Sequence, residues 1–149
     1  MQGVQLTAEF HDCAATALLA DPQPLRALCL RVVGEAGLTA VGELFHHFGP
    51  ALGVTGVVLL AESHLAVHTW PELRAVTLDV YVCNFNADNS DRAGRVLDAL
   101  EAAFAPARCE RQRVRRGELG ARVAAEAATA SATASATASA TASATAAER

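Results

Sequence analysis

The sequence predicts an α+β fold, a two-layer α/β sandwich in which an antiparallel sheet carries its helices on one face. Several segments alternate apolar and polar residues, with the period of two that half-buried strands show. Two other segments carry apolar residues at helical spacing and begin at residues that favour helix caps. These elements follow the order strand, helix, strands, helix, strand, which leaves one sheet face for a second subunit to cover.

The first half of the chain contains a strand, a helix and a second strand. Residues 4–10 alternate apolar and polar side chains and predict the first strand. Asp21 is expected to cap a helix that has Pro22 at its first position and ends at Gly37. Residues 38–48 are strand-like and stop before a Gly-Pro pair.

The middle of the chain is rich in strand patterns. Residues 54–61 are apolar on both faces, which is typical of a central strand. Residues 63–69 form a short extended segment that Pro71 ends. The next strand has two distinct faces, an apolar one of Val76, Leu78, Val80 and Val82 and a more polar one of Thr77, Asp79, Tyr81 and Cys83.

A second helix and a last strand complete the domain. Asp88 or Asn89 is expected to cap the helix, and Pro106 ends it. Its apolar stripe consists of Ala93, Val96, Leu97, Leu100 and Phe104. Residues 109–116 read as the last strand.

Length and composition predict one functional domain, residues 1–120, followed by a tail. Residues 121–149 are rich in Ala, Thr and Ser, and from residue 124 they lack aromatic and branched aliphatic side chains. Such a segment buries too little apolar surface to offset the entropy of ordering, so the tail is predicted to be disordered.

Charge and hydropathy argue against nucleic-acid and membrane partners. The formal net charge is −4, and the arginine cluster of residues 108–116 is interpreted as the solvated face of a strand. No stretch approaches the ~20 apolar residues of a membrane span, and no signal peptide is recognisable. A cytoplasmic location is therefore predicted. The four cysteines show no CxxC spacing, which favours reduced thiols over disulfides or zinc clusters.

The chain contains no lysine, because all twelve basic residues are arginine. Amine-forming decarboxylases usually hold pyridoxal phosphate as a lysine Schiff base to take up the electrons released with CO₂. A decarboxylase built from this sequence would need a carbonyl from another source.

Residues 62–72, Glu-Ser-His-Leu-Ala-Val-His-Thr-Trp-Pro-Glu, combine groups that could provide one. The Ser63 hydroxyl can attack the carbonyl of Glu62 if the backbone is strained and a base is near, which converts the amide into an ester. Removal of the Ser63 α-proton then splits the chain by β-elimination, and hydrolysis of the resulting enamine leaves a pyruvoyl group. A Glu-Ser pair alone would be an ordinary strand segment.

The eleven-residue segment resembles the self-cleavage site of the bacterial S-adenosylmethionine decarboxylase proenzymes, and the resemblance extends over nearly all of residues 1–117. It implies an α+β sandwich that cleaves at Glu62-Ser63 into chains 1–62 and 63–149, with a pyruvoyl cofactor derived from Ser63. It further implies a role in spermidine synthesis and at least a dimer whose two protomers share each active site. The implied site residues are His68 and Thr55 in processing, Cys83 as general acid, and Phe48, Leu65 and Glu72 as substrate contacts.

Two other functions remain open at this stage. The same pyruvoyl chemistry could decarboxylate arginine or ornithine, and residues 84–89 and the loop before Val54 depart from the family's usual form. A non-enzymatic or metal-binding module is the other alternative, since His64 and His68 share a strand face and His46 and His47 lie nearby in sequence. No carboxylate or cysteine stands at ligand spacing, so no metal is predicted.

Strand geometry adds one expectation about the cleavage site. Ser63 and His68 are separated by an odd number of residues, so an ideal strand would point their side chains to opposite faces. They can meet only if the chain bends at residues 62–63.

Overall fold

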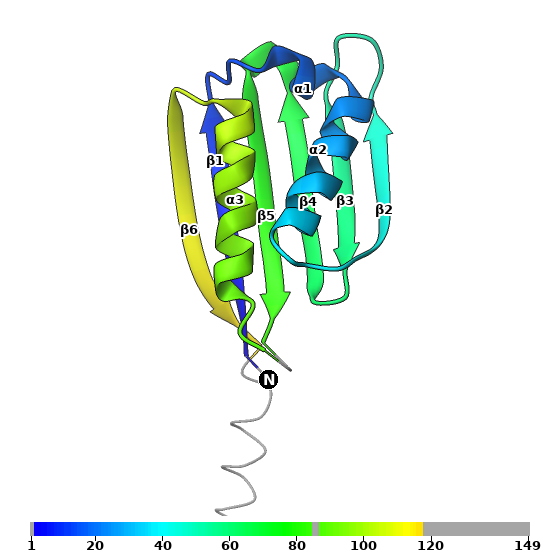
Figure 1. The fold of residues 1–149 in the computed structure, drawn as a ribbon. Helices are drawn as coiled ribbons and strands as arrows, with labels where there is room; N and C mark the ends of the chain where they lie inside the picture. Colours follow the sequence, from blue (N-terminus) through cyan, green and yellow to red (C-terminus); the bar gives the residue numbers. More distant parts are fainter. Residues whose placement is uncertain (1, 85–86, 118–149) are drawn as a thin grey trace, which may run out of the picture. The chain divides into compact units, whose positions relative to one another are not determined.

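The computed structural model describes residues 2–84 and 87–117, so the predicted tail, residues 121–149, lies outside the described residues. The strands are β1 (Gly3–His11), β2 (Ala40–His47), β3 (Val54–Leu60), β4 (Ser63–Trp70), β5 (Ala75–Cys83) and β6 (Arg108–Arg116) (Figure 1). The helices are α1 (Thr16–Ala20), α2 (Pro22–Glu35) and α3 (Ser90–Phe104), with a 3₁₀ turn, η1 (Pro71–Leu73).

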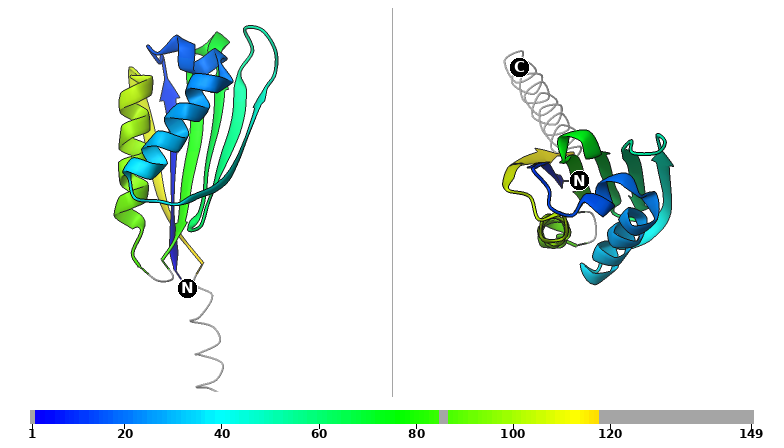
Figure 2. Two further views of the ribbon diagram at one scale, coloured as in Figure 1. Left: turned by 45° about the vertical axis from the view of Figure 1, so that its right-hand side comes forward. Right: turned by 90° about the horizontal axis from the view of Figure 1, so that it is seen from above.

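The six strands form one sheet in the order β2-β3-β4-β5-β1-β6, and every neighbouring pair is antiparallel. Helices α2 and α3 lie side by side on one face of this sheet, as the view from above in Figure 2 shows. The predicted α+β sandwich is therefore confirmed. Among the described residues, no helix is both long and apolar enough to cross a membrane.

Strand alternation builds the core between the sheet and the helices. In β5, Val76, Leu78, Val80 and Val82 are buried, whereas the residues between them are only half-buried. On α3 the predicted stripe from Ala93 to Phe104 is buried against the sheet. We call the sheet face away from the helices the open face.

The central strand predicted at residues 54–61 is confirmed as β3. Strand β3 does lie inside the sheet, but its burial alternates, and Leu59 on the open face is 51% exposed. Only the helix-facing side of this strand is covered within the chain. The apolar side chains of Leu44 and Leu59 therefore face outward on the open face.

The predicted side-chain caps of α2 and α3 are present, and the structure adds a short helix, α1. The Asp21 side chain accepts a hydrogen bond from the Gln23 amide and so caps α2, as expected. At α3 it is Asp88 that accepts from the Ser90 amide, at 2.9 Å, and the hydrogen bonds to Ser90 lower the pKa of Asp88. Helix α1 was not predicted, because it has five residues and no side-chain cap.

Candidate active site

The Glu62-Ser63 bond lies at the hairpin turn between β3 and β4. Ser63 has φ = +155°, at the outer edge of the region that L-residues seldom occupy. The carbonyl oxygen of Glu62 accepts a hydrogen bond from the Cys83 amide at 2.9 Å. The Glu62 carboxylate accepts from the Thr39 amide at 3.2 Å. The chain therefore bends at the cleavage site, and the carbonyl that the Ser63 hydroxyl would attack is held by a backbone N–H.

The bend brings the Ser63 hydroxyl to His64. Ser63 Oγ lies 3.2 Å from His64 Nδ1, and His64 Nε2 lies 3.2 Å from Asp79 Oδ1. Asp79 lies on β5, opposite Ala66 of β4, and Gln5 on β1 donates to the same carboxylate oxygen at 3.2 Å. These side chains come from three adjacent strands and form one continuous hydrogen-bond chain.

Cys83 lies at the same corner of the open face. Its thiol donates to the Tyr81 hydroxyl at 3.7 Å, and this hydrogen bond is the main cause that raises the pKa of Tyr81. The guanidinium of Arg116 lies 4.5 Å from the centre of the Tyr81 ring. The Cys83 carbonyl accepts from the Asn89 side chain at 3.0 Å, which fixes the end of β5. Cys83 thus lies beside the Glu62-Ser63 bond, through its amide hydrogen bond to the Glu62 carbonyl.

Four other predicted residues form a second cluster, at the other end of β4: Thr55, His68, Phe48 and Glu72. Thr55 and His68 are paired across β3 and β4, and Thr55 Oγ1 lies 2.6 Å from His68 Nδ1. His68 also borders a hollow of about 290 Å³ that Phe48 and Glu72 help to line. Phe48 is 58% exposed and offers a ring face to a ligand.

Leu65 lies on the other face of β4 from His64 and His68. Its side chain is fully buried in the core on the helix-facing side of β4. The side chain therefore does not reach the open face, and a contact between Leu65 and the substrate stays a prediction. Leu65 occupies the odd-numbered face of β4, which the period of two assigns to the core.

The two clusters are too far apart to act together within one chain. Ser63 is opposite Val82, whereas His68 is opposite Thr77, five residues further along the same antiparallel pair. At the rise of an extended strand this is about 17 Å. The bend at Ser63 therefore brings its hydroxyl to His64 and not to the His68 of its own chain.

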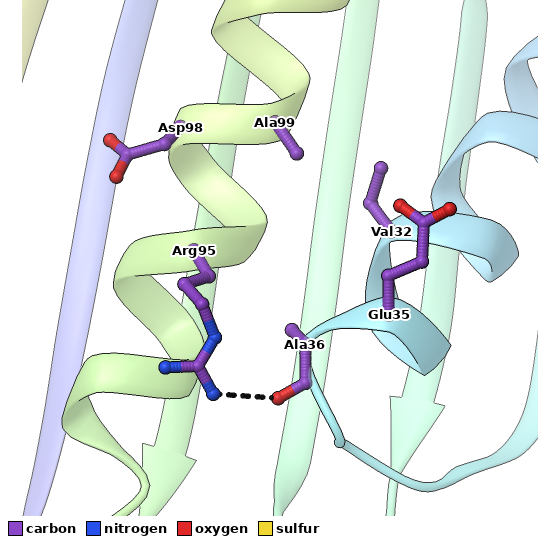
Figure 3. A pocket seen from close by; sticks show the side chains of 6 residues that line it. All are labelled: Val32, Glu35, Ala36, Arg95, Asp98 and Ala99. Carbon is purple, nitrogen blue, oxygen red and sulfur yellow. Dashed lines mark hydrogen bonds between the residues drawn. The ribbon is translucent and has the colours of Figure 1, made fainter.

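A larger hollow, of about 430 Å³, lies between α2 and α3 on the opposite side of the sheet (Figure 3). Its carboxylates are already engaged, because Glu35 pairs with Arg31 at 3.1 Å and Asp98 pairs with Arg111 at 2.6 Å. Arg95 donates to the Ala36 carbonyl at 3.0 Å. This hollow offers no free nucleophile or base, so we place the candidate site on the open face.

The histidines do not assemble a metal site in the part of the chain that the structure describes. No three His, Cys, Asp or Glu side chains gather there in a way that could hold an ion. His64 is bonded to Ser63 and Asp79, and His68 to Thr55. The sequence indicates His64 only as a possible metal ligand and does not predict its contact with Ser63. The alternation of β4 and β5 places His64 and Asp79 on the open face, but only the register between the two strands shows that these side chains meet.

The chain is similar in sequence to known proteins over nearly all of its described length. A sequence model described as S-adenosylmethionine decarboxylase matches residues 4–117. The S-adenosylmethionine decarboxylase proenzyme of Acidithiobacillus ferrooxidans is 35% identical over 117 residues, which cover 78% of this chain and 84% of that protein. The proenzyme of the same description from Pseudomonas paraeruginosa is 41% identical over 100 residues, covering 67% of this chain and 55% of that protein.

A solved structure shares the fold. The crystal structure of the adenosylmethionine decarboxylase from Aquifex aeolicus superposes with a TM-score of 0.71 at 32% identity, covering 78% of this chain and 92% of the other. The sequence match spans both residue clusters and all six strands. The chain belongs to the S-adenosylmethionine decarboxylase family.

Proposed function

We propose that this chain is a self-processing S-adenosylmethionine decarboxylase that cleaves itself at Glu62-Ser63 and converts Ser63 into a pyruvoyl group. The observation that carries the proposal is the corner where the Ser63 hydroxyl, the hydrogen-bonded Glu62 carbonyl and Cys83 meet. The product would be decarboxylated S-adenosylmethionine, for spermidine synthesis. The names of the relatives favour this substrate over arginine or ornithine.

The residues at this corner fit the cofactor. A pyruvoyl carbonyl at residue 63 would supply the electron sink that a chain without lysine cannot obtain from a lysine-bound cofactor. The Cys83 thiol stands on the neighbouring strand end and is suited to return a proton to the substrate carbon after CO₂ leaves. Its contact with the Tyr81 hydroxyl holds the thiol on the open face.

A second protomer would complete each site. Two copies packed through their open faces around a two-fold axis would bring the Ser63 corner of one chain to the His68 cluster of the other. This arrangement covers the outward-facing Leu44 and Leu59, and it bridges the distance of about 17 Å that separates the clusters within a chain. Phe48 would then stack on the nucleoside, Glu72 would accept from ribose hydroxyls, and His68 with Thr55 would assist the β-elimination.

Intact mass under denaturing conditions tests the processing. Two fragments that separate at Glu62-Ser63, with the larger lacking a free amine, are expected from the wild-type chain. A single chain that stays intact on long incubation would contradict the proposal. Decarboxylation assays with S-adenosylmethionine, arginine and ornithine on the processed protein then decide the substrate.

Co-expression of two inactive variants tests the shared site. Neither S63A nor H68A alone should process. In a mixed dimer, however, the H68A chain keeps its Ser63 and receives the intact His68 of the S63A chain. With tags of different mass, cleavage of the H68A chain alone is expected. No cleavage in the mixed dimer would mean that His68 acts within its own chain.

A further inference from the structure

We propose that His64, held by Asp79, is the catalytic base for the first step of self-cleavage, the shift of the Glu62 acyl group from nitrogen to oxygen. This inference rests on the proposed self-processing and adds a residue to it. His68 keeps its proposed role in the later β-elimination. The two histidines would then serve consecutive steps from opposite sides of the dimer interface.

The hydrogen-bond chain gives His64 the required tautomer. A carboxylate accepts but does not donate, so His64 Nε2 carries its proton toward Asp79 Oδ1, 3.2 Å away. The other ring nitrogen, Nδ1, is then left with a free lone pair that faces Ser63 Oγ at 3.2 Å. This is the orientation that a base needs in order to accept the hydroxyl proton.

Asp79 is itself oriented by its neighbours, which makes it the positioning residue. Gln5 donates to Asp79 Oδ1 at 3.2 Å, and Arg116 donates to the side-chain oxygen Oε1 of Gln5 at 2.6 Å. The His64 ring also packs edge-on against Tyr81, with the ring centres 5.8 Å apart. Three strands thus fix the imidazole beside the hydroxyl.

The step balances without any further reactant. As His64 Nδ1 removes the hydroxyl proton, Ser63 Oγ bonds to the Glu62 carbonyl carbon and closes a five-membered ring. The negative charge that develops on the Glu62 oxygen already faces the Cys83 amide, 2.9 Å away. The carbon–nitrogen bond then breaks, the imidazolium returns its proton to the Ser63 nitrogen, and an ester remains.

Treatment with hydroxylamine distinguishes the step that needs His64 from the step that needs His68, because it cleaves an ester at neutral pH but leaves an amide intact. In H64Q, purified as the full chain, we expect the acyl shift to slow by about 100-fold or more, the usual contribution of a general base. The precursor should then stay intact in hydroxylamine. In H68A the ester should accumulate, and hydroxylamine should split the chain at Glu62-Ser63. Thermal melting against S63A verifies that each variant is folded.

Asp79 variants provide a second readout. D79N keeps the shape but offers an amide N–H to His64 Nε2, which favours the tautomer with a proton on Nδ1 and should give a hydroxylamine-resistant precursor. D79E restores the carboxylate and should recover part of the processing, which a purely structural role would not require. H11Q, at the far end of β1, is the matched histidine control and should process at the wild-type rate.

The outcomes are distinct from those of the proposed function. A wild-type chain that never breaks would overturn the proposed self-processing itself. A wild-type chain that breaks, together with an H64Q variant that breaks within about threefold of its rate or accumulates ester, overturns only the role of His64 as base. Should H64Q fail to fold, processing of D79N at the wild-type rate overturns the proposal, and a resistant D79N precursor rescued by D79E supports it.

Discussion

The buried hydroxyl of Thr69 offers a sharp test of how the hollow beside His68 is held. Thr69 is 4% exposed, and its Oγ1 donates to the Leu19 carbonyl at 2.6 Å and accepts from the Val54 amide at 2.8 Å. It therefore joins β4 to the start of β3 and to α1. The substitution T69V keeps the shape of the side chain but leaves both backbone groups buried without this partner.

Each unsatisfied buried group costs about 1–3 kcal/mol, and the added methyl group recovers part of this, so T69V should lower the free energy of unfolding by about 2–4 kcal/mol. Urea unfolding in the S63A background, at a fixed protein concentration, measures the loss on an uncleaved chain. T69S, which keeps the hydroxyl, should lose less. T39V, at an exposed threonine, should stay within about 0.5 kcal/mol. A loss below about 0.5 kcal/mol in T69V would refute the reasoning, because the hydroxyl would then satisfy nothing of consequence.

Two further predictions concern stability at high pH and substrate binding. Burial raises the pKa of Cys29 from 9.0 to about 12, so the thiol stays neutral in the folded chain while the unfolded chain ionises. The contribution of the neutral Cys29 thiol to the free energy of unfolding is therefore fully present below pH 9 and is lost between pH 9 and 12, with a loss of roughly 1 kcal/mol at pH 10. Thermal or urea unfolding of C29A should lack this component, and an unchanged pH dependence in C29A would contradict the prediction. F48A should raise KM for S-adenosylmethionine by roughly 10- to 100-fold, as loss of one stacking partner does, with fragment masses like those of the wild type; an unchanged KM would exclude stacking on Phe48.

The sequence predicts the layers well, because they depend on local patterns. The alternation from Val76 to Cys83 and the Asp21 cap both operate within a few residues of their own position. Helix α1 was not predicted because a contact that is distant in sequence stabilises it: the Thr69 hydroxyl donates a hydrogen bond to the Leu19 carbonyl, 50 positions away. Strand register likewise decides which carboxylate meets His64, since the β4–β5 pairing places His64 opposite Tyr81 and beside Asp79. A one-dimensional pattern assigns a face but not a neighbour.

The strand order has a consequence for the protein after cleavage. Breaking the chain at Glu62-Ser63 would assign β1, β2 and β3 to one fragment and β4, β5 and β6 to the other. Strand β1 nevertheless sits between β5 and β6, so the fragments are interleaved in a single sheet. They could part only by drawing a nine-residue strand out from between two hydrogen-bonded neighbours. The cut would therefore leave the fold in place. Refolding of the cleaved protein, however, would become a bimolecular reaction, whose rate depends on the concentration of the two fragments.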